Sequence, residues 1–242
     1  MTHLVGVRAR WRTDSLGEFF CPGCGGDRRH RRQHGRRWLR LVGAPLLPLR
    51  TLDECVQCMT CRRRYPLEAL ERPTSARLTT LLRDAQYTVA LAVLAAGGTT
   101  ARAAREAACQ VVREAGFEDH GEAQVLAALA ALGGLGESAG APDAADAGVE
   151  AAGAAGPGPD RFSGCGSELA VELHATLEPL APHLAPQGLE RLLLQGAWIA
   201  LADGPYRPSE RDTLTAVGCC LRMTAEQIDS TLEAAARMPH QH

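Results

Sequence analysis

Apolar residues recur at helical spacing in two stretches of the chain, residues 74–132 and 167–238. Within the first stretch, the leucines, valines and alanines of residues 78–96 follow an i, i+3, i+4, i+7 pattern, which is typical of a helix with one buried face. The same spacing returns in residues 189–200. Both stretches are therefore predicted to be helical.

Helix boundaries are marked by residues of known preference. Gly97 and Gly98 should end the first helix, because glycine readily adopts the backbone conformation at which helices stop. Pro208 suits the first turn of a later helix, where its missing N–H is not needed. Thr224 and Gln227 have the spacing of a capping box, a reciprocal pair of side-chain to backbone hydrogen bonds that starts a helix.

The two helical stretches resemble two copies of one unit. The segment LAVLAAGG at 91–98 aligns with AWIALADG at 197–204, and each copy continues with a turn, a helix, a short break and a final helix. Neither copy can bury its apolar face alone, so we expect the copies to pack together. The stretch 133–166 between them is mostly Gly, Ala, Pro, Asp and Ser. We expect it to be a disordered insertion, because few large apolar side chains are present to bury.

The N-terminal residues 1–72 show a different pattern. Residues 38–42 (WLRLV) are expected to form a strand, whereas the apolar residues 44–49 are interrupted by two prolines and should form a turn or a sheet edge. The Arg-rich residues 28–37 are expected to form a loop. The predicted fold class is mainly α, with a small β-rich module preceding one helical domain. The predicted domains are the module at 1–72, the helical halves at 73–132 and 167–242, and the insertion at 133–166.

Charge is distributed unevenly along the chain. The 242 residues carry a net charge of −2, but residues 1–64 hold 14 Arg and 5 acids, which gives 14 − 5 = +9. The remaining residues hold 12 Arg and 23 acids, which gives −11. A basic segment of this kind favours contact with nucleic-acid phosphates. The alternative is an arginine surface that contacts only solvent.

Cysteine spacing in the basic segment indicates a metal site. Cys21 and Cys24 form one CxxC pair, and two such pairs can supply the four thiolates of a tetrahedral zinc site. The second pair has two alternatives, because Cys55, Cys58 and Cys61 are each three residues apart. We favour Cys58 and Cys61, since a short strand should follow the last ligand. One structural zinc ion is expected.

The cysteines belong to a longer segment with a family resemblance. The residues "FFCPGCGGDRRHRRQHGRRWLRLVGAPLLPL…CMTC" resemble a small zinc-ribbon family that has an FFCPxCG opening, an apolar middle with two prolines and a closing CxxC. The resemblance covers about residues 19–65 and implies a fold rather than a function.

An acidic turn lies in the second helical stretch. Asp203 and Glu210 flank a Gly-Pro turn, and their carboxylates can converge only if the turn folds one helix start over the preceding helix end. A hard cation such as calcium requires six to eight oxygen ligands, so any cation site here should be weak or vestigial. We expect the turn mainly to join two helices.

The residues around this turn carry a second resemblance. The segment "LLLQGAWIALADGPYRPSERDTLTAVGCCLRMTAEQIDSTL" is similar to the ADGxxxxxE region of TerB-like domains, which occur in tellurite-resistance proteins. That resemblance implies an all-helical domain with an internal two-fold repeat. In the first copy, Gly97 and Ala104 stand in place of the family's acids.

Function is expected from these two modules together. No Ser/His/Asp set, P-loop or dinucleotide motif is present in the sequence, so we do not expect an enzyme. The resemblance implies a tellurite-resistance or stress-response protein, with the ribbon as recognition module and the helices as scaffold or sensor for a protein partner. The alternative is a nucleic-acid-binding regulator that uses the Arg-rich ribbon. With neither a leader pattern nor an apolar span, the cytoplasm is the expected location.

Overall fold

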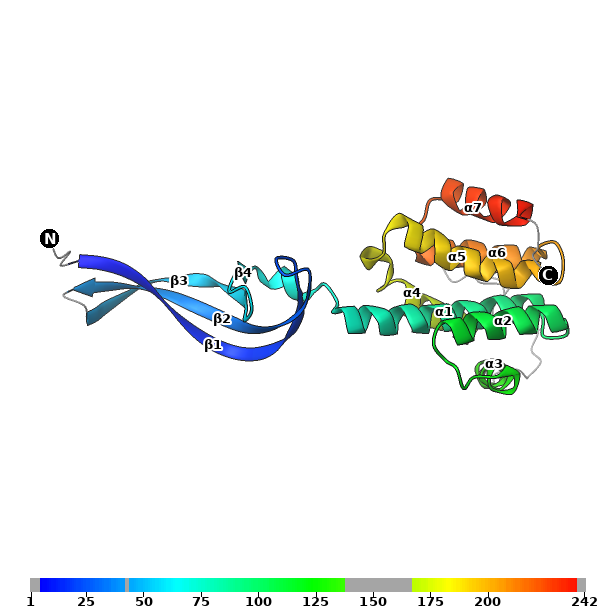
Figure 1. Cartoon of the computed structure of the whole chain (residues 1–242), viewed down its shortest axis with the longest axis horizontal. Helices are drawn as coiled ribbons and strands as arrows, with labels where there is room; N and C mark the ends of the chain where they lie inside the picture. The colour runs from blue at the N-terminus through cyan, green and yellow to red at the C-terminus, as the bar shows by residue number, and fades with distance from the viewer. Residues whose placement is uncertain (1–4, 42–43, 138–166, 239–242) are drawn as a thin grey trace, which may run out of the picture. The chain divides into compact units, whose positions relative to one another are not determined.

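The computed structural model describes residues 5–41, 44–137 and 167–238 (Figure 1). The chain divides into two compact units between Thr79 and Thr80. The described residues are 56% helical, and a four-stranded antiparallel sheet accounts for 23% of them. The prediction of a mainly α fold is therefore wrong, because the N-terminal unit contains strands much longer than those of a small ribbon.

The first unit is built on a sheet with strand order β1-β2-β3-β4. β1 (Val5–Cys21), β2 (Gly26–Leu41) and β3 (Ala44–Cys58) contain 17, 16 and 15 residues, and β4 (Arg64–Tyr65) pairs with the end of β3. The Arg-rich residues 28–37 lie within β2, the strand that pairs on both sides. The prediction of a loop at this place is wrong.

The two prolines of β3 follow the second predicted alternative, a sheet edge. Pro45 and Pro48 lie inside the strand rather than in a turn, and the pairing with β2 shifts its register next to each of them. In the described sheet, β4 pairs only with Val56 and Gln57, so the prolines face no third strand. Proline is tolerated on such an edge because its missing N–H breaks no ladder.

Apolar burial in this unit is concentrated at one end of the sheet. Phe19, Val56 and two cysteines are buried there, and the short 3-10 helix η1 (Leu67–Leu70) packs against them. At the opposite end, Val7 and Leu47 are 54% and 59% exposed. The sheet therefore has an anchored end and an exposed end.

The second unit is helical. α5 (Pro186–Leu201) packs against α2, α6 and α7. The Cα of Gly196 in α5 lies against side chains of α1 and α6, where a Cβ would be only 3.0 Å from Val89 and 2.9 Å from Leu214. The other helices are α1 (Ser75–Gly97), whose first residues belong to the first unit, α2 (Arg102–Glu114), α3 (Glu122–Glu137), α4 (Ser167–Leu177), α6 (Pro208–Cys220), α7 (Ala225–Arg237) and the 3-10 turn η3 (Ala181–His183).

The helix boundaries follow the predicted signals closely. Gly98 follows the last residue of α1 with a φ of +85°, and Pro208 is the first residue of α6. Thr224 and Gln227 form the capping box of α7, with hydrogen bonds of 2.9 and 3.2 Å. These predictions are confirmed.

The insertion and the repeat have different outcomes. α3 extends to Glu137, so the first five residues of the predicted insertion 133–166 are helical. The rest of that prediction, residues 138–166, lies outside the described residues. The order α1-α2-α3 and then α5-α6-α7, with 13 residues in both α2 and α6, agrees with the expected order of elements.

Two glycines test how tightly the helices pack. A Cβ on Gly218 in α6 would lie 2.5 Å from Cγ1 of the buried Ile228, whereas the atoms nearest a Cβ on Gly188 in α5 are 3.6 Å away. We predict that Gly218→Ala lowers the free energy of unfolding by about 1–3 kcal/mol through overpacking. Gly188→Ala should raise it by up to about 1 kcal/mol, because alanine favours helix. Urea unfolding followed by circular dichroism measures both, and an unchanged midpoint in Gly218→Ala would contradict the packing described here.

Candidate metal centre

Two turns of the same geometry hold the cysteines of the first unit. In the first turn, the N–H groups of Cys24 and Gly25 donate to the carbonyl of Cys21 at 3.1 and 2.9 Å. In the second, the N–H of Arg62 donates to the carbonyl of Cys58 at 3.0 Å. Gly25 and Arg62 both have left-handed backbones, with φ of +67° and +60°. In each turn, the residue after the second cysteine closes the loop.

These turns bring four sulfur atoms together. The Sγ atoms of Cys21, Cys24, Cys58 and Cys61 all lie within 4.8 Å of one another. Cys21 and Cys61 are 3.8 Å apart at sulfur, and Cys24 and Cys58 are 4.0 Å apart. Around a tetrahedral ion with metal–sulfur bonds of about 2.3 Å, neighbouring sulfurs lie about 3.8 Å apart. A disulfide would need about 2.05 Å. The spacing therefore fits one four-coordinate metal ion.

Cys55 is excluded from this group by the geometry of its strand. Its side chain is buried, but its sulfur is not among the four that converge. β3 is extended through Cys58, and residues three apart in a strand point to opposite faces of the sheet. Only the turn after Cys58 can return a second thiol to the same point, and that thiol belongs to Cys61.

Tyr65 supports the site from outside the cysteine group. Its hydroxyl oxygen accepts a hydrogen bond from the N–H of Gly23 at 3.1 Å and lies 3.5 Å from the sulfur of Cys21. A Cβ at position 23 would collide with this hydroxyl, so glycine is required there. When Cys21 is a thiolate, the O–H of Tyr65 can donate to it.

The thiols influence one another's ionisation. Burial raises the pKa of Cys21, but hydrogen bonds from Tyr65, from the Cys24 backbone and from neighbouring thiols outweigh burial and lower that pKa to about 6. Burial and the neighbouring thiols raise the pKa of Cys24 to about 12. Ionisation of one thiol therefore disfavours ionisation of the next. A bound divalent cation would remove this repulsion between thiolates.

The acidic turn uses its carboxylates within the protein. Arg207 donates from its guanidinium to Asp203 at 2.7 Å and from its backbone N–H to Glu210 at 2.8 Å. Glu210 is only 1% exposed. In the described part of the chain, the four cysteines are the only group of three or more His, Cys, Asp or Glu residues that could hold a metal ion.

The same turn closes the end of α1. The guanidinium of Arg207 donates to the carbonyl of Gly97, and the hydroxyl of Ser209 donates to the carbonyl of Ala96 at 2.8 Å. Both carbonyls belong to the last turn of a helix, which lacks partners of its own. A Cβ on Gly97 would collide with the carboxylate of Glu210. Glycine at position 97 is thus what lets the acid of the second copy approach α1.

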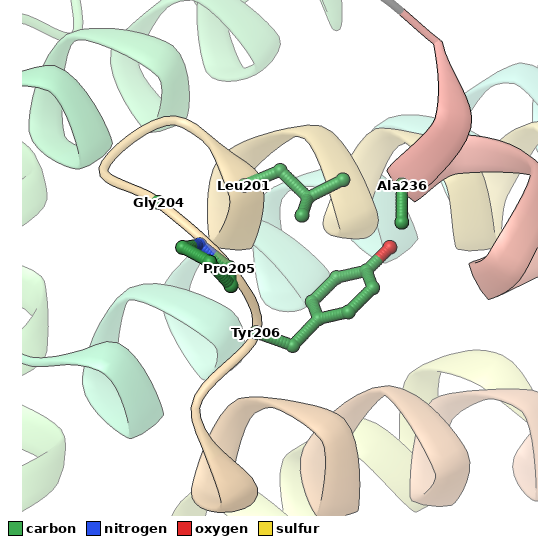
Figure 2. Close-up of a pocket in the computed structure, with 5 residues that line it drawn as sticks. All are labelled: Leu201, Gly204, Pro205, Tyr206 and Ala236. Atoms are coloured by element: carbon green, nitrogen blue, oxygen red, sulfur yellow. The ribbon is translucent and has the colours of Figure 1, made fainter.

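A small cavity lies beside this turn (Figure 2). It has a volume of about 250 Å³, below the usual range for ligand pockets. The hydroxyl of Tyr206 donates to the carbonyl of Leu232 at 3.2 Å, so the polar side chain of the lining already has a partner. The cavity offers no catalytic group. Its lining consists of Leu201, Gly204, Pro205, Tyr206 and Ala236.

No protein-family model, curated protein or solved structure matches this chain. The resemblances to zinc ribbons and to TerB-like domains therefore stay hypotheses. None of the helices within the described residues has the length and apolar content needed to span a membrane.

The metal site leads to a prediction about ligand choice. Protein purified without chelator should contain one zinc ion per chain, and Cys61→Ser should lose it because only three thiolates remain. Cys55→Ser should retain the full zinc content, since its sulfur lies outside the group. Elemental analysis of the two variants decides the matter. Zinc retained in Cys61→Ser but lost in Cys55→Ser would show that the other cysteine pair binds the metal.

The buried acid leads to a prediction about pH. Burial raises the pKa of Glu210 above its ordinary value, so the folded chain keeps a proton that the unfolded chain has already lost. The free energy of unfolding should therefore fall as pH rises from about 4 through the raised pKa of the folded state. Glu210→Gln should remove this contribution. Urea unfolding at several pH values measures it, and an identical pH slope in both proteins would contradict the assignment.

Proposed function

We propose that the first unit is a zinc-stabilised nucleic-acid-binding module and that the second is a non-enzymatic helical scaffold. One observation carries the proposal: the exposed end of the sheet holds exposed arginines for which the described residues supply no carboxylate partner. Each of these guanidinium groups is exposed and available to contact phosphate. These arginines, named here the sheet arginines, are Arg8, Arg10, Arg12, Arg36, Arg37 and Arg50.

Three acids of the same unit already have partners elsewhere. Asp14 lies 2.7 Å from Nδ1 of His34, and Glu54 accepts a hydrogen bond from Arg32 at 2.9 Å. The carboxylate of Asp27 accepts hydrogen bonds of 2.8 and 2.9 Å from the backbone N–H of Ser75. Among the described residues, no ion pair neutralises a sheet arginine, so these guanidinium groups stay available to an anionic partner. A surface of this kind attracts polyanions, of which nucleic acids are the most general class.

Zinc is the ion that we propose for the four cysteines. Four thiolates at tetrahedral spacing satisfy zinc completely and leave no open position for a substrate. The ion would therefore fix the anchored end of the sheet rather than take part in a reaction. Unoxidised thiols suit a reducing compartment, which supports the cytoplasm as the location.

A second candidate concerns the helical unit alone. Its resemblance to TerB-like domains implies a role in tellurite resistance or stress response, exerted through a protein partner. The closed turn at Asp203 and Glu210 favours a scaffold over a cation sensor, because Arg207 and the backbone already occupy both carboxylates. Tellurite sensitivity of the native host after loss of this protein tests the candidate. Unchanged growth on tellurite would count against it.

Nucleic-acid binding should depend strongly on salt. The zinc-loaded full chain should bind a labelled oligonucleotide at 50 mM salt and lose affinity as a power of salt concentration, because each neutralised phosphate releases counterions. Replacing Arg8, Arg10 and Arg12 with glutamine should weaken binding and flatten that dependence. Fluorescence anisotropy across a salt series measures both effects.

A charge-matched control distinguishes binding by the sheet arginines from a general effect of the protein's net charge. Three exposed helical arginines can be replaced in the same way, with the same change in total charge and no expected loss of affinity. Absence of binding at low salt by the zinc-loaded chain would refute the proposed function. The control residues are Arg102, Arg191 and Arg237.

A further inference from the structure

The exposed end of the sheet has two different faces. In the register of β1 and β2, Arg8 lies opposite Trp38, Arg10 opposite Arg36 and Arg12 opposite His34. Residues directly opposite each other in an antiparallel pair share one face, and so do residues two apart in a strand. These six residues therefore form one surface, which we name the Trp38 face.

Two arginines of this face repel each other. Arg10 and Arg36 are directly opposite each other, where Cβ atoms lie about 4.5–5.5 Å apart and like charges destabilise a sheet. Acids border this face at its His34 end, where Asp14 contacts His34 and where Asp53 and Glu54 lie opposite His34 in β3. None of the six residues of the face is itself acidic. A bound anion would relieve the repulsion between Arg10 and Arg36.

The tryptophan of this face has no aromatic or cationic partner on its ring in the described part of the chain. Trp38 is partly exposed, and among the described residues neither an aromatic ring nor a guanidinium stacks on it. Trp11 belongs to the opposite face, where the guanidinium of Arg64 lies 4.2 Å from its ring centre and Gly35 lies beneath it. Both tryptophans are partly exposed, but within the described residues only Trp11 has a guanidinium stacked on its ring.

We propose that the Trp38 face binds single-stranded nucleic acid, with a base stacked on Trp38 and the phosphates paired with the surrounding arginines. This inference rests on the proposed function, which names nucleic acid without naming the strand. Arginines that alternate along β1 lie about 6.8 Å apart, so they form a line that a flexible phosphate chain can follow. An aromatic ring between cations is the arrangement that holds single strands without reading sequence.

A duplex would use this surface less well. In a double helix, each base is stacked between its neighbours, so Trp38 could reach no base face without unstacking a pair. The arginines could still contact the phosphates of one strand. We therefore expect single strands to bind more tightly than duplexes at equal salt, and we expect Trp38 to account for the difference.

The sheet supplies a matched pair of double variants. Arg37 and Arg50 are also directly opposite each other and exposed, but they lie on the other face of the same strands. Arg10→Gln with Arg36→Gln and Arg37→Gln with Arg50→Gln therefore remove the same charge at neighbouring positions. If the Trp38 face is the site, the first pair should lower affinity for a single strand about tenfold or more and reduce the salt slope by about 1.4. The second pair should change affinity less than about threefold.

Trp38 is tested by two substitutions. Trp38→Leu should lower single-strand affinity about tenfold and leave the salt slope unchanged, because it removes stacking and no charge. Trp38→Phe should retain most of the affinity, since it keeps an aromatic ring. Zinc content and circular dichroism verify that each variant is folded, and Trp38→Phe keeps the test valid if the leucine variant is unstable.

The experiment measures fluorescence anisotropy of the zinc-loaded full chain with a labelled oligothymidine, an oligouridine and a duplex of equal length. Tighter binding to both single strands than to the duplex is expected, and the DNA and RNA arms show which sugar is preferred. Equal duplex binding that is insensitive to Trp38→Leu would overturn this inference and leave the proposed function intact. Equal losses from the two arginine pairs would overturn the choice of face. Failure to bind any of the three would refute the proposed function as well.

Discussion

Convergence of four cysteines at one end of the sheet is the constraint on which the first unit depends. A sheet of a few strands is marginal in water unless one face is packed, and here apolar burial is limited to Phe19, Val56 and their neighbours beside the cysteines. A metal ion at that point would supply folding free energy that so small a core cannot. The second turn also places Arg62 in a left-handed conformation, which disfavours a non-glycine residue by about 1–2 kcal/mol. Metal binding would offset that strain.

Because the sheet is stabilised at its anchored end, its exposed end does not need an apolar core of its own. Strands β1, β2 and β3 remain paired by backbone hydrogen bonds, while exposed arginines lie on both faces, Arg10 and Arg36 on one and Arg37 and Arg50 on the other. Side chains there are not selected for burial, so arginine can occupy consecutive positions and project to opposite faces, as Arg36 and Arg37 do. The distribution of charge and aromatic residues on this end then reflects what it contacts rather than how it folds. This separation of a folding end from a contacting end is the physical basis for proposing a binding role.

Features that depend on residues close together in the sequence were predicted correctly, and features that depend on distant pairing were not. The capping box of Thr224 and the turn geometry of Cys58-x-x-Cys61 depend on residues within one turn, and short-range spacing was enough to find them. The strand through residues 28–37 could not be found in this way. Strand prediction relies on apolar residues that alternate with polar ones, and the buried residues of this strand are His30, Gln33 and Gly35, none of which has an apolar side chain. Pro45 and Pro48 left a turn and a sheet edge as alternatives for a related reason, because only the pairing of β3 with β2 shows that they lie on an edge, where a missing N–H is harmless.

The lack of an acidic side chain at Gly97 is as informative as the acid at Glu210. In the sequence, it stands where the resemblance to TerB-like domains would place an acid, which suggested a lost site. In the structure, the buried carboxylate of Glu210 occupies the space beside it, and Arg207 binds the Gly97 carbonyl. An aspartate at position 97 would add a second carboxylate to a buried acid and exclude it sterically. Glu210, Arg207 and Gly97 thus together cap the C-terminal end of α1. The same three residues would have to separate before this turn could receive a cation, which is the physical reason to regard it as a joint between helices.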